Sequence, residues 1–270
     1  MFGSRLLVVF TLSLSALGSP SVPVHLLNAG VKVVGGEVAA KGQFPYQVSF
    51  QERILGVWKH FCGGTIIDPS YVITAAHCVE GADFTSPQGL RVVAGEQDLH
   101  ELDGDEQVQN INFIIEYPYY DPITYENDIA ILRLEEPFVY NEFVNQLDLP
   151  QFDRNVTGEL CNVSGWGRTT EGGKASTILL YTQVPVLTDH DCREAYTQDE
   201  IMDSMLCAGL EEGGKGICQG DSGGPLACEA SLFGVVSWSY GCARPGLPDV
   251  YTEVSYFIDW IHSHVTSLKE

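Results

Sequence analysis

The segment Cys218-Gln219-Gly220-Asp221-Ser222-Gly223-Gly224-Pro225 places one hydroxyl group between small residues. Glycines on both sides let the backbone turn sharply and point its N–H groups into a cavity. This arrangement suits a nucleophilic Ser222 beside an oxyanion hole, in which the amides of Gly220 and Ser222 would hold a developing negative charge. A plain Gly/Ser turn is the alternative explanation for so short a segment.

Two other segments supply the partners that such a serine needs. A serine is a poor nucleophile without a base, and the base needs a carboxylate to orient it. Thr74-Ala75-Ala76-His77-Cys78 offers His77, and Asn127-Asp128-Ile129-Ala130-Ile131-Leu132 offers Asp128. A structural histidine beside Cys78 or a capping aspartate would explain either one alone. Together, the three segments predict a nucleophile, a base and an orienting carboxylate.

In the order His, Asp, Ser, these segments resemble the trypsin–chymotrypsin family of secreted serine endopeptidases. The similarity runs from about Val33 to the C-terminus, and the segments 211–215 and 240–246 look most like crustacean digestive trypsins. The family mechanism implies that the histidine accepts the serine proton and later delivers it to the leaving amine. It also implies pairing of the substrate main chain, as an added strand, with Ser237, Trp238 and Ser239.

Short apolar or alternating runs recur along the chain, for example at 47–50, 71–74 and 129–134, with Gly, Pro, Asp and Asn between them. They predict many short antiparallel strands. The resemblance implies an all-β fold of two six-stranded Greek-key barrels, at about 33–144 and 145–270, packed together with a C-terminal helix. One face of that helix would carry Phe257, Trp260, Ile261 and Val265.

Composition limits the partners and the compartment. The chain has 14 Lys and Arg against 36 Asp and Glu, a formal charge of −22, which argues against nucleic acid or an anionic membrane as a partner. The negative electrostatic field of such a chain would attract cationic proteins or peptides, although a solvated acidic surface is the simpler explanation of the charge. Eight cysteines, an even number, indicate an oxidised, secreted protein. They lack the C-x-x-C spacing usual for zinc, and the resemblance implies the disulfides Cys62–Cys78, Cys161–Cys228, Cys192–Cys207 and Cys218–Cys242.

The N-terminus has the features of a signal peptide from Met1 to about Gly18, because Arg5 precedes an apolar run and small residues follow it. No later run reaches the length of a membrane span, so a soluble, secreted product is expected. Residues 19–32 would form a short activation propeptide that ends at Lys32.

Cleavage between Lys32 and Val33 would, by the family pattern, free an α-ammonium group that inserts into the interior and pairs with Asp221. Either charge would be costly to bury alone, so their pairing couples cleavage to ordering of the oxyanion loop. A turn-forming aspartate with a local cap is the alternative for Asp221.

The expected specificity pocket departs from ordinary trypsins. Six residues before Ser222, where a trypsin has the aspartate that binds Arg or Lys, this chain has Gly216, followed by the bulky Ile217. A carboxylate, Asp249, is present on the opposite wall, and Ser239 replaces a glycine at the rim. The combination resembles crab collagenolytic proteases and neutrophil elastase. Cleavage after Arg or Lys would persist if Asp249 faces the cavity, and aliphatic side chains would fit best if it is screened, so broad specificity is the hypothesis.

An acidic segment, 96–106, resembles the calcium loop of vertebrate trypsins in length and in the placement of its acids. Calcium prefers six to eight oxygen ligands on flexible loops, and Gly104 permits a tight bend. A solvated acidic loop is the alternative. The candidate ligands are Glu96, Asp98, Glu101, Asp103 and Glu106.

Two N-glycosylation sequons occur, at Asn155 and Asn162. Asn155 is the candidate, since it falls in an expected loop between the barrels, whereas Asn162 lies inside a predicted strand. No triad context surrounds the other internal histidines, His25, His60, His100 and His190.

Two other kinds of function compete with a digestive endopeptidase. A catalytically dead homologue acting as a binding protein would lack a triad residue, yet Ser222 is present. A regulatory protease of the clotting or immune type would carry an added N-terminal module, and only a short segment precedes Lys32. The resemblance further implies protein and peptide substrates, protein protease inhibitors, an activating protease, no required cofactor and a monomer.

Overall fold

The computed structural model describes residues 34–151, 154–196 and 200–267, which lie within one compact unit, 31–270. The predicted signal peptide, the propeptide and the Lys32–Val33 junction lie outside the described residues. In the described part of the chain, no helix has the length and apolar character needed to cross a membrane.

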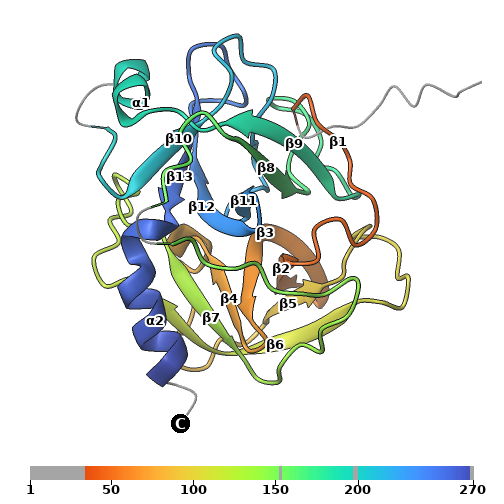
Figure 1. The fold of residues 1–270 in the computed structure, drawn as a ribbon. Helices are drawn as coiled ribbons and strands as arrows, with labels where there is room; N and C mark the ends of the chain where they lie inside the picture. The colour runs from red at the N-terminus through yellow and green to blue at the C-terminus, as the bar shows by residue number, and fades with distance from the viewer. Residues whose placement is uncertain (1–33, 152–153, 197–199, 268–270) are drawn as a thin grey trace, which may run out of the picture. The chain divides into compact units, whose positions relative to one another are not determined.

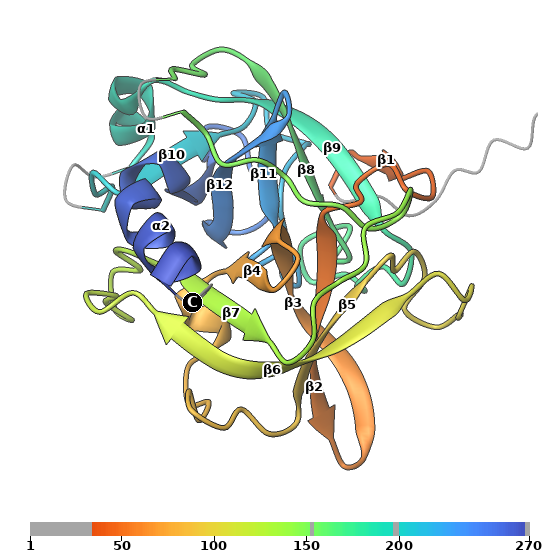
Figure 2. The same cartoon turned by 60° about the horizontal axis from the view of Figure 1, so that its bottom comes forward.

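The first sheet is a closed barrel of six antiparallel strands, as predicted, and its strand order is β2-β3-β4-β7-β6-β5 (Figure 1). Leu55 and Gly56 join β2 to β3 with φ values of 50° and 85°, and two such residues form a tight turn that matches the strand twist. Figure 2 shows this hairpin extending beyond the neighbouring strands. The six strands are β2 Gln47–Ile54, β3 Val57–Asp68, β4 Tyr71–Thr74, β5 Leu90–Ala94, β6 Gln107–Glu116 and β7 Ala130–Leu134.

The second sheet has seven strands in the order β1-β9-β8-β11-β12-β13-β10. The strands β9 and β10 of this sheet approach each other, because Val186, directly after β9, forms an antiparallel bridge with Ala208 at the end of β10. Six strands therefore surround a second core, and β1, from the N-terminal part of the chain, pairs with β9. The strands are β1 Glu37–Val38, β8 Leu160–Gly165, β9 Leu180–Pro185, β10 Met205–Ala208, β11 Pro225–Cys228, β12 Ser231–Trp238 and β13 Asp249–Glu253.

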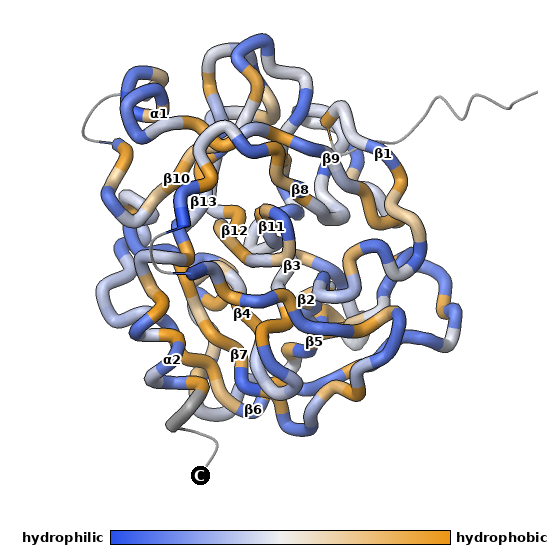
Figure 3. Tube along the Cα trace, viewed as in Figure 1, coloured by the Kyte–Doolittle hydropathy of each residue, from blue (hydrophilic) through white to orange (hydrophobic). Residues whose placement is uncertain are grey.

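Each sheet encloses its own apolar core. Ile66, Ile73 and Leu132 are fully buried in the first core, and Leu226 and Tyr251 in the second. Figure 3 shows apolar stretches along β4 and β7 of the first sheet and along β12 of the second. Because alternate residues of each strand face inward, short strands suffice to fill both interiors.

The helix predicted at the C-terminus is present as α2 (Ile258–Ser267). Phe257 lies just before it, in the 3-10 turn η2 (Val254–Phe257), and packs with Ile261 and Val265 into the core of the first barrel.

A second helix, α1 (Asp189–Ala195), is one that the sequence pattern does not predict. Its seven residues are too few to show a helical period, and Thr188 starts it by accepting a hydrogen bond from the Asp191 amide.

The four disulfides join the pairs that the resemblance implies. One lies in the first barrel, where it links β3 to the 3-10 turn η1 (Ala76–Cys78). The other three lie in the part of the chain that builds the second sheet. The four disulfides are Cys62–Cys78 in the first barrel, and Cys161–Cys228, Cys192–Cys207 and Cys218–Cys242 in the part of the chain that builds the second sheet.

Candidate active site

His77 and Asp128 are brought together by the pairing of two strands of the first barrel. His77 follows β4 in η1, and Asp128 lies just before β7. Because β4 and β7 pair antiparallel, with Thr74 opposite Ala130, the end of β4 lies beside the start of β7. The Nδ1 atom of His77 is 2.7 Å from Oδ2 of Asp128, and the His77 amide donates to Oδ1 at 2.9 Å.

The second sheet supports the Asp128 carboxylate. Its side chain is fully buried, and a buried carboxylate needs hydrogen-bond donors to offset its lost hydration. Ser237 at the end of β12 donates to Oδ2 at 2.6 Å, and Thr252 of β13 donates to the Asp128 carbonyl at 2.7 Å. The orientation of the imidazole therefore depends on both sheets.

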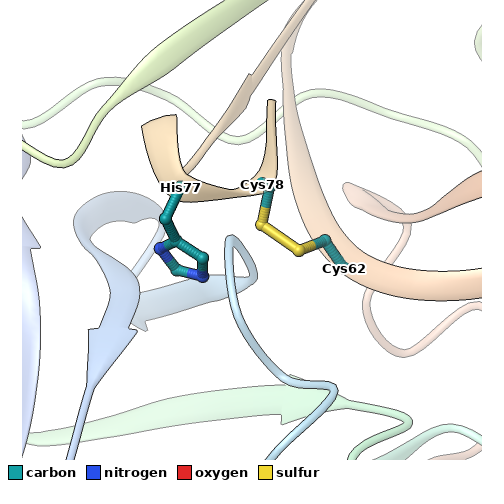
Figure 4. Close-up of side chains that lie close together, drawn as sticks. All are labelled: Cys62, His77 and Cys78. Atoms are coloured by element: carbon teal, nitrogen blue, oxygen red, sulfur yellow. A yellow bond between two sulfur atoms is a disulfide. The ribbon is translucent and has the colours of Figure 1, made fainter. Parts of the chain in front are cut away.

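Burial acts to lower the pKa of His77, but the hydrogen bond and charge of Asp128, aided by Glu80, outweigh it and raise that pKa. The Nδ1 atom is engaged by Asp128, so Nε2 is the nitrogen left to exchange a proton. Figure 4 shows the ring beside the Cys62–Cys78 disulfide. These three side chains lie close enough to share a metal ion, but both sulfurs are committed to the disulfide, so no thiolate is available.

Ser222 is fixed by backbone hydrogen bonds to both sheets. Its carbonyl accepts from the Gly63 amide at 2.7 Å, and the next amide, of Gly223, donates to Val236 at 2.8 Å. Gly223 has φ of 76°, and a Cβ there would collide with the Thr74 hydroxyl and the Gly63 carbonyl. Only glycine therefore allows the loop to lie this close to the strand that leads to His77. Among the described residues, no hydrogen bond joins the Ser222 hydroxyl to the imidazole.

The amides of Gly220 and Ser222, predicted as oxyanion donors, donate to no other group in the described part of the chain. The opposite side of this peptide loop is held by His60, a residue to which the sequence assigns no role. Its Nε2 lies 3.0 Å from the Gly220 carbonyl, and its Nδ1 lies 2.9 Å from the hydroxyl of Ser49. Burial lowers the pKa of His60 to about 4, so the ring is neutral and Nε2 donates to the carbonyl.

Asp221 lies in a narrow space made by two glycines. Its carboxylate accepts from the Gly167 amide at 2.8 Å and from the Cys218 amide at 3.0 Å. A Cβ on Gly165 or Gly167 would overlap this carboxylate. Burial raises the pKa of Asp221 to about 6, although the two hydrogen bonds act to lower it. No cation among the described residues contributes to this pKa.

The described N-terminal segment lies near this loop. The Val34 carbonyl accepts from the Gly216 amide at 3.3 Å, and Gly35 fits so closely against Gly214 and Lys215 that a side chain at position 35 would collide with both. The chain that follows the Lys32–Val33 junction is therefore in contact with the wall of the predicted specificity pocket.

Asp249 lies at that wall and is screened from solvent. It is 1% exposed; Oδ2 accepts from the Ile217 amide at 2.8 Å, and Oδ1 has no partner among the described residues. A Cβ on Gly216 would overlap Oδ2, so the small residue at 216 makes room for the carboxyl group at 249. Ile217 is 3% exposed and packs in the second core. Burial raises the pKa of Asp249 to about 8, so the group is mostly uncharged at neutral pH.

Ser237, Trp238 and Ser239 lead out of β12 beside the site. The hydroxyl of Ser237 is directed to Asp128, which adds a positioning role to the predicted main-chain pairing. Ser239 at the predicted rim donates to the Gly241 carbonyl at 2.7 Å, which holds its side chain against its own loop.

The acids predicted to bind calcium do not converge on one point, since no three of the described carboxylates in this loop lie within 4.8 Å of one another. Asp103 is paired with Lys41, whose Nζ lies 2.6 Å from it and 3.0 Å from Asp105. Glu101 is exposed. These two residues do not fit a calcium site in this conformation.

Glu96 does fit a cation. It is 8% exposed, and its Oε1 is buried without a hydrogen-bond partner among the described residues. Burial, and then the charges of Glu106 and Asp98, raise its pKa to about 7. Glu106 accepts hydrogen bonds from the amides of Asp103 and Gly104 at 2.7 and 2.9 Å, and its charge is one of those that raise the pKa of Glu96.

The two sequons differ as expected from the sequence. Asn155 is exposed, and its Oδ1 accepts from the Thr157 amide at 2.8 Å in a local turn. Asn162 lies in β8, where it pairs with Gln183 of β9.

Comparison with known proteins places these features in one family. A sequence model of the family described as Trypsin matches residues 33–261. Trypsin-1 of Astacus astacus is 49% identical over 236 residues, which cover 86% of this chain and 99% of that relative. Anionic trypsin of Bos taurus is 41% identical over 237 residues, or 87% and 90% of the two chains. Vitellin-degrading protease of Bombyx mori is 37% identical over 268 residues, or 98% and 96%.

Two β-barrels with this site and these relatives define a serine endopeptidase that acts on protein substrates. The chain belongs to the trypsin family, and the similarity to crustacean trypsins is confirmed by the Astacus relative.

Proposed function

We propose that the enzyme cleaves peptide bonds through an acyl-enzyme on Ser222, with His77 as the general base and then the general acid. Asp128 fixes the tautomer of His77 and stabilises the imidazolium that forms. The observation that carries this assignment is the Asp128–His77 hydrogen bond of 2.7 Å, which leaves Nε2 open, next to a serine loop held on Gly63. The open amides of Gly220 and Ser222 would bind the oxyanion, and each would stabilise the transition state by roughly 3 kcal/mol.

The same proposal includes synthesis as a secreted zymogen. Its support is the uncompensated, buried Asp221 and the contact of Val34 with Gly216, because an α-ammonium on Val33 would supply the missing cation. An α-amino group has a pKa of about 8, so the active form should weaken as the pH rises above that value.

The test is hydrolysis of chromogenic peptides before and after limited cleavage at Lys32–Val33. We expect activity only in the cut protein, with mass spectrometry confirming Val33 as the new N-terminus. Equal activity of the uncut chain would contradict the zymogen proposal, and no activity after clean cleavage would contradict the catalytic one.

For the residue before the scissile bond, we propose a preference for aliphatic side chains, with acceptance of Arg and Lys that grows as Asp249 ionises. The support is the burial of Asp249 and its Oδ1 atom, which has no hydrogen-bond partner among the described residues. A neutral carboxyl group attracts a cation weakly, whereas the ionised form pairs with one. Proteins and peptides of broad sequence are therefore the substrates, consistent with a digestive role.

We further propose that a calcium ion binds at Glu96 and Glu106, while Lys41 neutralises Asp103 and Asp105. We expect calcium at ten times its dissociation constant to stabilise the fold by about 1.4 kcal/mol, which raises the Tm by about 3–6 °C. The measurement is calorimetry in CaCl2 against MgCl2 or EDTA, with Glu96→Gln expected to lose the shift. Glu101→Gln, an exposed acid of the same loop, is the matched control. A Tm that ignores calcium in the wild type would refute the site.

The remaining parts of this proposal that rest on family membership are a monomeric state, an activating protease that cuts after Lys32, and regulation by protein protease inhibitors. Secretion rests on the signal-peptide pattern and the even number of cysteines, and a glycan on Asn155 rests on its exposed sequon.

A further inference from the structure

Glu80 lies three residues after His77, just beyond the 3-10 turn η1 that carries the imidazole. Its side chain is exposed, and both residues line one cavity of about 650 Å³. Glu80 therefore belongs to the surroundings of the ring, although Asp128 is the residue that is hydrogen-bonded to it. A carboxylate at this place acts on the imidazole through its charge.

Tyr120, in the loop between β6 and β7, holds the Glu80 carboxylate. Its hydroxyl donates to Oε1 of Glu80 at 2.7 Å, and its own amide donates to the Tyr117 carbonyl at 3.1 Å. Burial, then the hydrogen bond to Glu80 and the charge of Asp128, raise the pKa of Tyr120, so the hydroxyl remains a donor. The contact joins the segment that follows His77 to the loop that leads to Asp128.

Negative charges dominate the surroundings of His77. Burial acts to lower its pKa, and Asp128 and Glu80 are the charged groups that raise it. Glu116, at the end of β6, is partly buried, and burial and then the charges of Glu80 and Asp128 raise its pKa. The three carboxylates are therefore close enough to interact. The other titratable groups at the ring are Tyr125, whose ring lies 5.6 Å from the imidazole, and Glu52, Arg53 and Asp83, which line the same cavity.

The imidazole changes its charge during the reaction. In the acyl-enzyme mechanism, His77 takes the proton of Ser222 and becomes an imidazolium. A carboxylate nearby stabilises this cation and has a much weaker interaction with the neutral ring. The charge of Glu80 therefore lowers the energy of the transition state more than that of the resting enzyme.

We propose that Glu80, held by Tyr120, is a positioning residue for the catalytic base, and that its charge stabilises the imidazolium of His77 while the acyl-enzyme forms. The inference rests on the proposed acyl-enzyme function and adds a second carboxylate to it, beside Asp128. Because Glu80 is exposed, its contribution is small and is screened by salt.

The test is the pH profile of kcat/KM for the cut wild type and for Glu80→Gln at low ionic strength. The substrate is a blocked peptide without charged residues and with Leu before the scissile bond, so Glu80 does not attract it. A unit charge about 10 Å away through water changes a rate by a factor of about two. At about pH 8 we expect the variant to be about two- to threefold slower, with the loss in kcat rather than KM.

Near about pH 5 the two enzymes should be nearly equal. The imidazole of the variant binds its proton less tightly, so a larger fraction of the variant has a neutral base at low pH, and this offsets its slower reaction. In about 1 M NaCl the difference at about pH 8 should disappear. Tyr120→Phe, which releases the carboxylate, should show part of the same pattern.

Asp83→Asn is the matched control, because it removes one negative charge from the same cavity, and Asp83 is not among the groups that raise the pKa of His77. Its profile should equal that of the wild type. No loss in Glu80→Gln at about pH 8, or a loss of equal size at every pH and salt concentration, overturns the proposal and leaves the catalytic one intact. Failure of the cut wild type to cleave the peptide overturns both.

Discussion

Replacing Ser222 by Ala is expected to lower kcat/KM of the cut enzyme by about 10⁵–10⁶-fold. Removal of the nucleophile leaves only substrate binding and oxyanion stabilisation. The fold should persist, because the Ser222 contacts recorded in the described structure are made by its backbone. The measurement is peptide hydrolysis after cleavage at Lys32–Val33, together with the Tm.

His77→Ala provides the matched comparison. Because base and nucleophile act as one unit, we expect a loss of similar size, and the double variant should lose little more than either single one. A Ser222→Ala enzyme that keeps more than about one hundredth of its activity, with an unchanged Tm, would disprove the assignment.

The second large effect is expected from exchanging the residues at 216 and 249. Gly216→Asp combined with Asp249→Gly moves the carboxylate to the position that trypsins use and removes the group that would collide with it. We expect the ratio of kcat/KM for Arg over Leu to rise by about 100-fold at pH 7, since a hydrogen-bonded ion pair is worth roughly 1.5–3 kcal/mol. Gly216→Asp alone should instead lower the Tm, because a side chain there overlaps Asp249.

The wild type should show the same effect as a pH dependence. Burial, opposed by the Ile217 hydrogen bond and reinforced by Asp221, raises the pKa of Asp249 to about 8. The group is neutral below that pH and charged above it, so the ratio of Arg to Leu hydrolysis should rise between about pH 6.5 and 9.5. Taking a ratio cancels the titration of His77, which both substrates share. Asp249→Asn should give a flat ratio, and a flat ratio in the wild type would contradict the proposal.

Local sequence patterns predicted the parts of the molecule that depend on neighbours in the chain. Alternating runs predicted the strands, and the apolar face that includes Ile261 and Val265 predicted the helix α2. The glycines around Ser222 indicated a sharp loop, and the structure shows why one of them, Gly223, must lack a side chain. Resemblance then supplied the two-barrel arrangement, which short-range patterns do not contain.

Contacts between distant segments could not be predicted in this way. His60 supports the Gly220 carbonyl from 160 residues away, and Thr252 reaches the Asp128 carbonyl across 124 residues. Both residues lie inside strands, and their roles depend on contacts with distant segments that the neighbouring sequence does not reveal. Lys41, which follows β1, likewise pairs with Asp103 across 62 residues, and no local spacing signals that ion pair.

The distribution of the disulfides has a consequence for the enzyme after internal cleavage. Among the described residues, which include all eight cysteines, no disulfide joins the chain before β8 to the chain after it. A single break between β7 and β8 would therefore produce two fragments with no covalent link, one carrying His77 and Asp128 and the other Ser222. The two fragments would form the active site only while associated, so the nicked enzyme would lose specific activity on dilution, whereas the intact chain would not.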